Sequence, residues 1–171
     1  VLAGCGTPQA IPLQDISLSA PWQDGEESYY EVRASGTPLG NASWRWKKAA
    51  AGWLQAYEVV LSSRADRGET ELDNALMPVF AWRTVGEARY EAGYSPELVV
   101  ITTTVGTTVT VKEMTRSSLA LDNDQTLQTQ RALPFAPGLA VSYLNIIPTT
   151  GSSAAVRVAV DGPVTLTVPA G

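Results

Sequence analysis

The chain has 171 residues with 17 acidic and 12 basic side chains, a net charge of −5, no histidine and a single cysteine. This length fits one domain that can bury a core of its own. The acidic balance and the scattered cations exclude a nucleic-acid partner, because phosphate backbones are bound by clustered cations. The absence of histidine removes the commonest general base near neutral pH and the commonest ligand of transition metals.

The chain opens with Leu2-Ala3-Gly4-Cys5, the residue pattern of a bacterial lipobox. Small residues before the cleavage point fit a narrow protease site, and the cysteine thiol takes the lipid. We therefore predict that Cys5 is lipidated, that residues 1–5 are the remnant of a signal peptide, and that the protein is anchored on the extracytoplasmic side of a cell-envelope membrane. The alternative is a lone cysteine in a loose N-terminal tail. No run of about 18 apolar residues is present, so the lipid anchor would be the membrane contact.

Residues 6–27 contain three prolines and many polar residues with little periodicity, which predicts a linker. Residues 28–171 predict one antiparallel β-domain. A strand begins near Tyr30, a turn follows at 36–40, and further strands are expected at 41–48 and 53–63. Alternation places Trp44 and Trp46 on one face of the second strand, and Trp53 and Tyr57 on one face of the third.

The rest of the chain continues this pattern, with a turn signal at 66–68 and a clear hairpin around Gly106. Residues 122–133 predict the one helix, because they carry polar residues at the start and end before Pro134. The fold class is therefore all-β: a single domain with a curved antiparallel sheet or partly open barrel and one short helix. The remaining strands are expected at 69–77, 79–85, around Arg89, 98–105, 107–114, 140–147, 154–160 and 164–168.

Three stretches carry a family resemblance: residues 30–44 (YEVRASGTPLGNASW), residues 124–134 (DQTLQTQRALP) followed by Gly138, and the closing residues 168–171 (VPAG). Their order resembles bacterial exported proteins grouped as domain-of-unknown-function family 3108. The resemblance covers about residues 28–171 and implies an envelope location and an antiparallel β-domain. It implies no catalytic residue. Relatives usually continue past the closing motif, so we expect this domain to be truncated at its C-terminus, with its last strand at an open sheet edge.

Chemical motifs are scarce. The sequence contains no Gly-x-Ser-x-Gly, no Ser-x-x-Lys, no phosphate-binding glycine loop and no dinucleotide fingerprint. The run from Asp122 to Asp124 is similar to the start of a calcium loop, but Leu127 and Leu133 stand where that loop needs glycine and glutamate. A helix N-cap explains the run better. We predict no catalytic residue, no metal and no cofactor.

Aromatic residues give the one indication of a binding site. Trp44, Trp46, Trp53 and Tyr57 could form a platform for sugars or acyl chains, although such clusters in β-domains are more often core. Two functions remain open. The first is a non-enzymatic module that binds a hydrophobic ligand, a glycan or an envelope protein; the second is a carboxylate-dependent hydrolase of an envelope polymer. We favour the first function, because the second requires two acidic side chains to converge at one site, which the sequence does not show.

Overall fold

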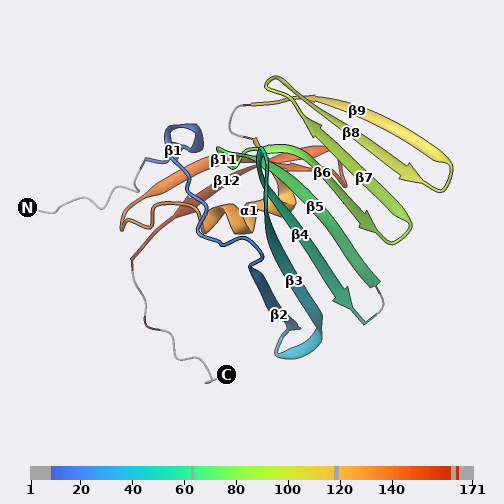
Figure 1. The fold of residues 1–171 in the computed structure, drawn as a ribbon, viewed down its shortest axis with the longest axis horizontal. Helices are drawn as coiled ribbons and strands as arrows, with labels where there is room; N and C mark the ends of the chain where they lie inside the picture. The colour runs from blue at the N-terminus through green and yellow to red at the C-terminus, as the bar shows by residue number, and fades with distance from the viewer. Residues whose placement is uncertain (1–8, 63, 118–119, 163–164, 166–171) are drawn as a thin grey trace, which may run out of the picture.

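The computed structural model describes residues 9–62, 64–117, 120–162 and 165. Within them, the chain forms a large sheet, a small sheet and one α-helix (Figure 1). Cys5 and, apart from residue 165, the strand expected at 164–168 fall outside this description, so lipidation and the open C-terminal edge stay predictions. Among the described residues, no helix is long and apolar enough to cross a membrane.

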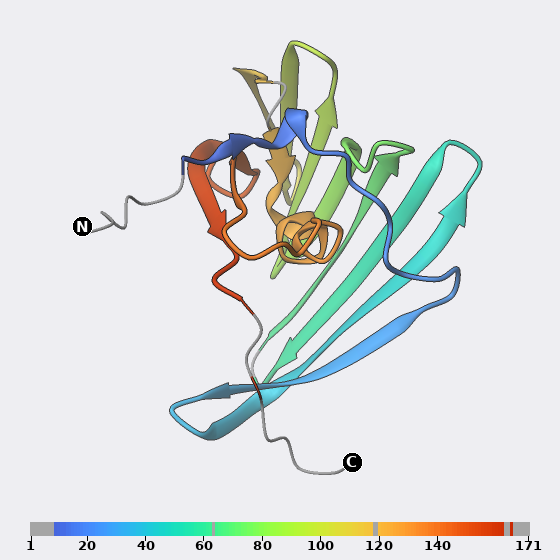
Figure 2. The same ribbon diagram turned by 90° about the vertical axis from the view of Figure 1, so that its left-hand side faces the viewer.

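The large sheet has eight strands in chain order, each antiparallel to the next, and confirms the predicted all-β class with one short helix. The sheet is curved, and its edge strands do not pair with each other within the described residues (Figure 2). Its strands are β2 (Glu27–Ala34), β3 (Thr37–Ala49), β4 (Gly52–Leu61), β5 (Arg64–Asp73), β6 (Pro78–Val85), β7 (Ala88–Tyr94), β8 (Leu98–Val105) and β9 (Thr108–Thr115).

The small sheet is built around β11 (Ala140–Ile147). Strand β12 (Ser152–Ala159) pairs antiparallel along one side of β11. On the other side, β1 (Ile11–Pro12) and β10 (Ala120–Asp122) pair parallel with successive parts of the same strand. This sheet and helix α1 (Asn123–Gln130) lie on the concave side of the large sheet (Figures 1 and 2).

Two buried clusters join these layers. One places Ala92, Val99 and Ile101 of the large sheet against Ala120 and Ile146 of the small sheet. Burial of these side chains follows from the two-residue alternation of the strands, which turns one set toward the helix and the small sheet. The other cluster combines the N-terminal segment, the large sheet and the loop after α1, through Trp22, Trp46, Leu72, Leu76 and Ala132. The concave face is therefore a core wherever these elements cover it.

The expected linker differs from what the structure shows for residues 9–27. This segment contains β1 and a 3₁₀ turn (Leu13–Asp15), and it packs onto the domain. Trp22 is 4% exposed, and its ring stacks on Trp46 with centroids 3.6 Å apart. Burial of so large an apolar ring outweighs the irregular backbone that prolines impose. The polar composition indicated a linker because an irregular segment that is held by tertiary packing has no periodic pattern in its sequence.

The turn expected at residues 66–68 is wrong, because these residues lie inside β5. Gly68 serves close packing rather than a turn. A Cβ atom there would lie 2.4 Å from the carbonyl oxygen of Trp82 and 2.8 Å from a ring carbon of Tyr57. The missing side chain lets the Tyr57 ring lie against the sheet, which is a known use of glycine within strands.

Helix α1 begins where the sequence predicted, but it ends at Gln130 rather than at residue 133. Asp122 is the N-cap, and its carboxylate accepts a hydrogen bond from the backbone N–H of Asp124 at 2.8 Å. The side chain of Gln125 accepts from the backbone N–H of Asp122 at 3.2 Å, which completes a capping box. The N-cap interpretation of this run is therefore confirmed.

Candidate functional site

The strand register identifies the side chains that share the concave face. Trp44 lies opposite Tyr57, Tyr57 opposite Gly68, and Gly68 opposite Arg83. Directly opposed residues in antiparallel strands point to the same side of a sheet. Arg83 forms a salt bridge with Asp124 of α1, so this row faces the helix. Trp44 therefore lies on the concave face, beside the part that α1 covers.

A buried polar cluster ties α1 to the large sheet. The guanidinium of Arg83 donates hydrogen bonds to the Tyr57 hydroxyl, at 3.1 Å, and to the Asp124 carboxylate. Gln55 donates to the backbone carbonyl of Asp124 at 2.9 Å. The side chains of Arg83 and Asp124 are only 14% and 7% exposed. Burial raises the pKa of the Tyr57 hydroxyl, so it remains protonated at any physiological pH.

Asp122 lies at the centre of the same cluster and is fully buried. Its carboxylate accepts hydrogen bonds from the Tyr94 hydroxyl and from the backbone N–H of Asp124. Burial, together with the nearby charge of Asp124, raises the pKa of Asp122 to about 7, although the hydrogen bond from Tyr94 acts to lower it. Burial also raises the pKa of Asp124, while Arg83 opposes the shift. A raised carboxyl pKa can mark an acid catalyst, but here the acids are enclosed and their hydrogen bonds hold the helix in place.

The structure separates the four predicted ligand residues. Trp46 is 1% exposed and stacked on Trp22, and Tyr57 is buried in the polar cluster. Trp53 is half-buried, with the ammonium of Lys48 lying 4.5 Å above its ring. Trp44 is half-buried on the concave face. Of the four, only Trp44 and Trp53 reach the surface, and they do so in different places.

Trp44 belongs to a part of the concave face that we call the open half. Its ring meets Tyr30 edge to face, with centroids 5.2 Å apart, and Tyr30 is 47% exposed. Figure 2 shows β2 to β5 extending beyond α1 and the small sheet at this end. The register places aliphatic neighbours on the same face. The open half is defined by Tyr30, Val32, Trp44, Val59 and Leu61, of which the four besides Tyr30 are half-buried.

Sequence reasoning missed Arg83, Tyr94 and Trp22. Alternation along β6 places Arg83 on the inward face, which for an arginine is a sign of a buried partner. Trp22 stood in a segment without periodicity, where a lone tryptophan was the only available indication of packing. Among the described residues, no group of three His, Cys, Asp or Glu side chains is arranged to hold a metal ion.

Comparison with family models, with curated proteins and with solved structures finds no match to this chain. The resemblance to domain-of-unknown-function family 3108 therefore stays a prediction.

Proposed function

We propose that this protein is a membrane-anchored lipoprotein of the bacterial envelope whose open half binds the acyl chain of a hydrophobic ligand. The observation that carries the proposal is the half-exposed pair of Trp44 and Tyr30 among aliphatic side chains on a concave surface. Ligand sites in proteins are concave and mostly apolar, with a few polar groups that fix orientation.

The polar groups lie at the far end of the open half. Arg64 lies opposite Leu61 in the register, and it forms a salt bridge with Asp66 at 2.5 Å. An acyl chain lying across Trp44, Val59 and Leu61 would bring its polar headgroup to this ion pair, which offers both hydrogen-bond donors and acceptors. Removing the apolar surface of the chain from water supplies the binding free energy, at about 25 cal/mol per Å².

The test is displacement of a fluorescent fatty acid, cis-parinaric acid, by oleate. Trp44→Ala removes the largest ring of the open half, so we expect affinity to fall roughly tenfold. Trp82→Ala is the matched control, because Trp82 lies opposite Glu69 on the other face of the sheet. If the wild-type protein fails to bind cis-parinaric acid, or if both tryptophan variants bind like the wild type, the concave site is wrong.

The anchor is tested separately in the full precursor. Cys5→Ser should release the protein from the membrane fraction, because the thiol that carries the lipid is gone. Mass spectrometry of the wild-type protein from its own host should show an acyl mass on Cys5. Unchanged fractionation together with an unmodified cysteine would contradict the lipid anchor, but would not bear on the proposed binding site on the concave face.

The alternative of a carboxylate-dependent hydrolase has its best candidate pair in Asp122 and Asp124, whose pKa values are both raised. Asp122 is fully buried, and its oxygens accept hydrogen bonds from Tyr94 and the helix backbone. A glycosidic bond needs direct access to both acids. The observed burial therefore favours the binding module over the hydrolase.

A further inference from the structure

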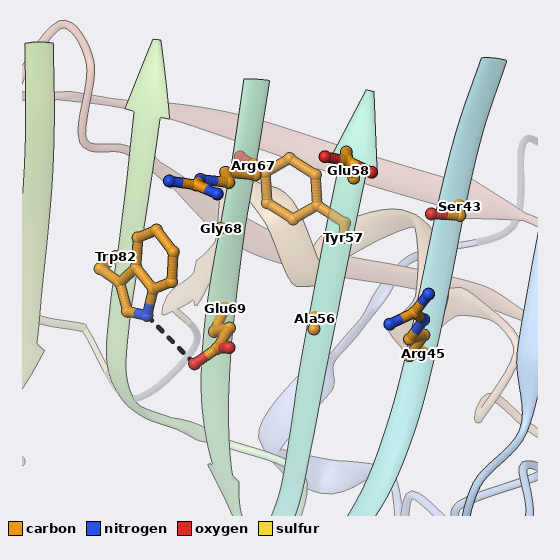
Figure 3. Close-up of a pocket in the computed structure, with 9 residues that line it drawn as sticks. All are labelled: Ser43, Arg45, Ala56, Tyr57, Glu58, Arg67, Gly68, Glu69 and Trp82. Atoms are coloured by element: carbon orange, nitrogen blue, oxygen red, sulfur yellow. Dashed lines mark hydrogen bonds between the residues drawn. The ribbon is translucent and has the colours of Figure 1, made fainter. Parts of the chain in front are cut away.

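Two hollows adjoin on the convex face of the large sheet. The first has a volume of about 250 Å³, and Figure 3 shows Trp82 and Arg67 at one side of it and Glu58 and Ser43 at the other. The second has a volume of about 350 Å³ and lies toward the β2 edge. Both are lined by Ser43 and Glu58, so they meet at these two residues. We call them the convex groove, represented by Tyr29, Asn41, Ser43, Glu58, Arg67 and Trp82.

The convex groove lies on the face opposite to the open half. Ser43 lies opposite Glu58, and Glu58 lies opposite Arg67, one residue along from the row that contains Trp44 and Tyr57. Adjacent residues in a strand point to opposite faces of a sheet. The groove therefore forms a second surface whose ligand does not compete for space with an acyl chain on the concave side.

The groove offers hydrogen-bonding groups that the described part of the chain does not use. Glu58 and Arg67 are exposed and directly opposed, yet no hydrogen bond or salt bridge of either side chain is found among the described residues. The guanidinium of Arg67 turns toward Trp82 and away from Glu58 (Figure 3). A carboxylate and a guanidinium held apart across the floor provide acceptors and donors for one ligand between them.

Other charged groups at the rim already have partners. Arg45 forms a salt bridge with Glu27 at 3.0 Å, and Glu69, which keeps its negative charge, accepts a hydrogen bond from the indole of Trp82 at 3.1 Å. With Glu58 and Arg67 balancing each other, the groove has no surplus of positive charge that would attract an anionic polymer. The chain's net charge of −5 also repels an anionic polymer. A neutral ligand rich in hydroxyl groups fits these charges best.

Aromatic rings lie at both ends of the groove. Tyr29 is 68% exposed at the end toward β2. Trp82 is fixed at the other end, because the guanidinium of Arg89 lies 4.5 Å from its ring and its N–H is bonded to Glu69. Exposed aromatic rings on a sheet can contact the C–H faces of sugar rings, while the polar side chains between them bond hydroxyl groups. We propose that the convex groove binds a neutral oligosaccharide.

The experiment uses an array of neutral oligosaccharides of four to six residues, built from glucose, galactose, mannose or N-acetylglucosamine. The strongest ligand is then titrated by calorimetry. We expect binding by the wild-type protein, and roughly tenfold weaker binding by Tyr29→Ala and by Glu58→Gln. Both positions are exposed, so neither change should impair folding. Glu113→Gln is the control, because Glu113 is an exposed carboxylate on β9, outside the groove.

Each outcome decides the proposal. No binding to any sugar on the array overturns it, and so does binding that Tyr29→Ala and Glu58→Gln leave unchanged. Loss of binding in Glu113→Gln equal to that in Glu58→Gln would show a general charge effect and would also overturn it. Trp44→Ala should bind the sugar like the wild type. Failure of the acyl-chain site and failure of the sugar site are therefore separate results.

Discussion

The two halves of the concave face are built by the same strands, yet they end in different environments. Under α1 and the N-terminal segment, Trp46 is sealed against Trp22. Two residues earlier on the same strand and the same face, Trp44 meets the ring of Tyr30 edge to face and remains half-exposed. Identical alternation thus produces core at one end and an apolar surface at the other. What distinguishes them is whether a second layer of the chain lies above the sheet.

The largest expected effect separates the two tryptophans. Trp46→Ala removes a buried ring and leaves a cavity against Trp22, so we expect a loss of about 3–5 kcal/mol in the free energy of unfolding. Trp44→Ala removes a half-exposed ring and should cost about 1 kcal/mol. Urea unfolding followed by circular dichroism measures both. Equal losses would show that the open half is as much a part of the core as the covered half.

The boundary between the halves lies at Gly68, over which the Tyr57 ring lies. In Gly68→Ala, the added Cβ meets a backbone carbonyl at 2.4 Å, so the strand or the ring must shift. We expect destabilisation of about 1–3 kcal/mol. Gly93→Ala on β7 is the control, because nothing lies within 4 Å of its added Cβ. Thermal unfolding that ranks the two variants in the opposite order would contradict this packing.

The stability of the layer that α1 forms over the sheet should depend on pH through Asp122, the N-cap of this helix. Its pKa in the folded protein is about 7, against 3.8 for an ordinary aspartate, so the folded state holds the proton more tightly. The stability that Asp122 contributes is therefore complete below about pH 4 and is lost as the pH rises to about 7. In Asp122→Asn, the amide can still cap the helix but does not titrate. The free energy of unfolding of this variant should therefore change less between about pH 4 and about pH 7 than that of the wild type.

Urea unfolding across this pH range measures the effect. Asp15→Asn, at an exposed aspartate, controls for the change in net charge. Parallel pH profiles for the wild type and Asp122→Asn would show that the buried carboxyl does not govern the slope.

The smallest effect on stability is expected in the open half. Leu61→Thr replaces a half-buried side chain at the far end of β4, where none of the described residues forms a second layer over the face. The free energy of unfolding should fall by about 0.5 kcal/mol, while binding of cis-parinaric acid should weaken measurably. A large loss of stability without any effect on binding would assign Leu61 to the core instead.

Sequence periodicity was sufficient for β3 and β4, because their alternation depends only on which side of each residue faces an apolar layer. The hairpin of β8 and β9 was predicted instead from its β-branched residues on either side of Gly106. The capping box was also local, since Asp122 and Gln125 lie within one turn of each other. The turn expected at 66–68 was wrong, because Gly68 makes room for the Tyr57 ring of the neighbouring strand and does not form a turn in its own backbone.

The sequence by itself determined the all-β class, the faces of the tryptophan-bearing strands and the start of the helix, because each of these follows from residues close together in the chain. Tertiary structure alone decided that Trp22 packs on Trp46, and that Arg83 meets Asp124 some forty positions later. These contacts join segments that are distant in sequence. Whether a ring or a charge is buried depends on which of those segments packs against it. Whether an aromatic residue on the sheet is core or surface was for the same reason settled only by the fold.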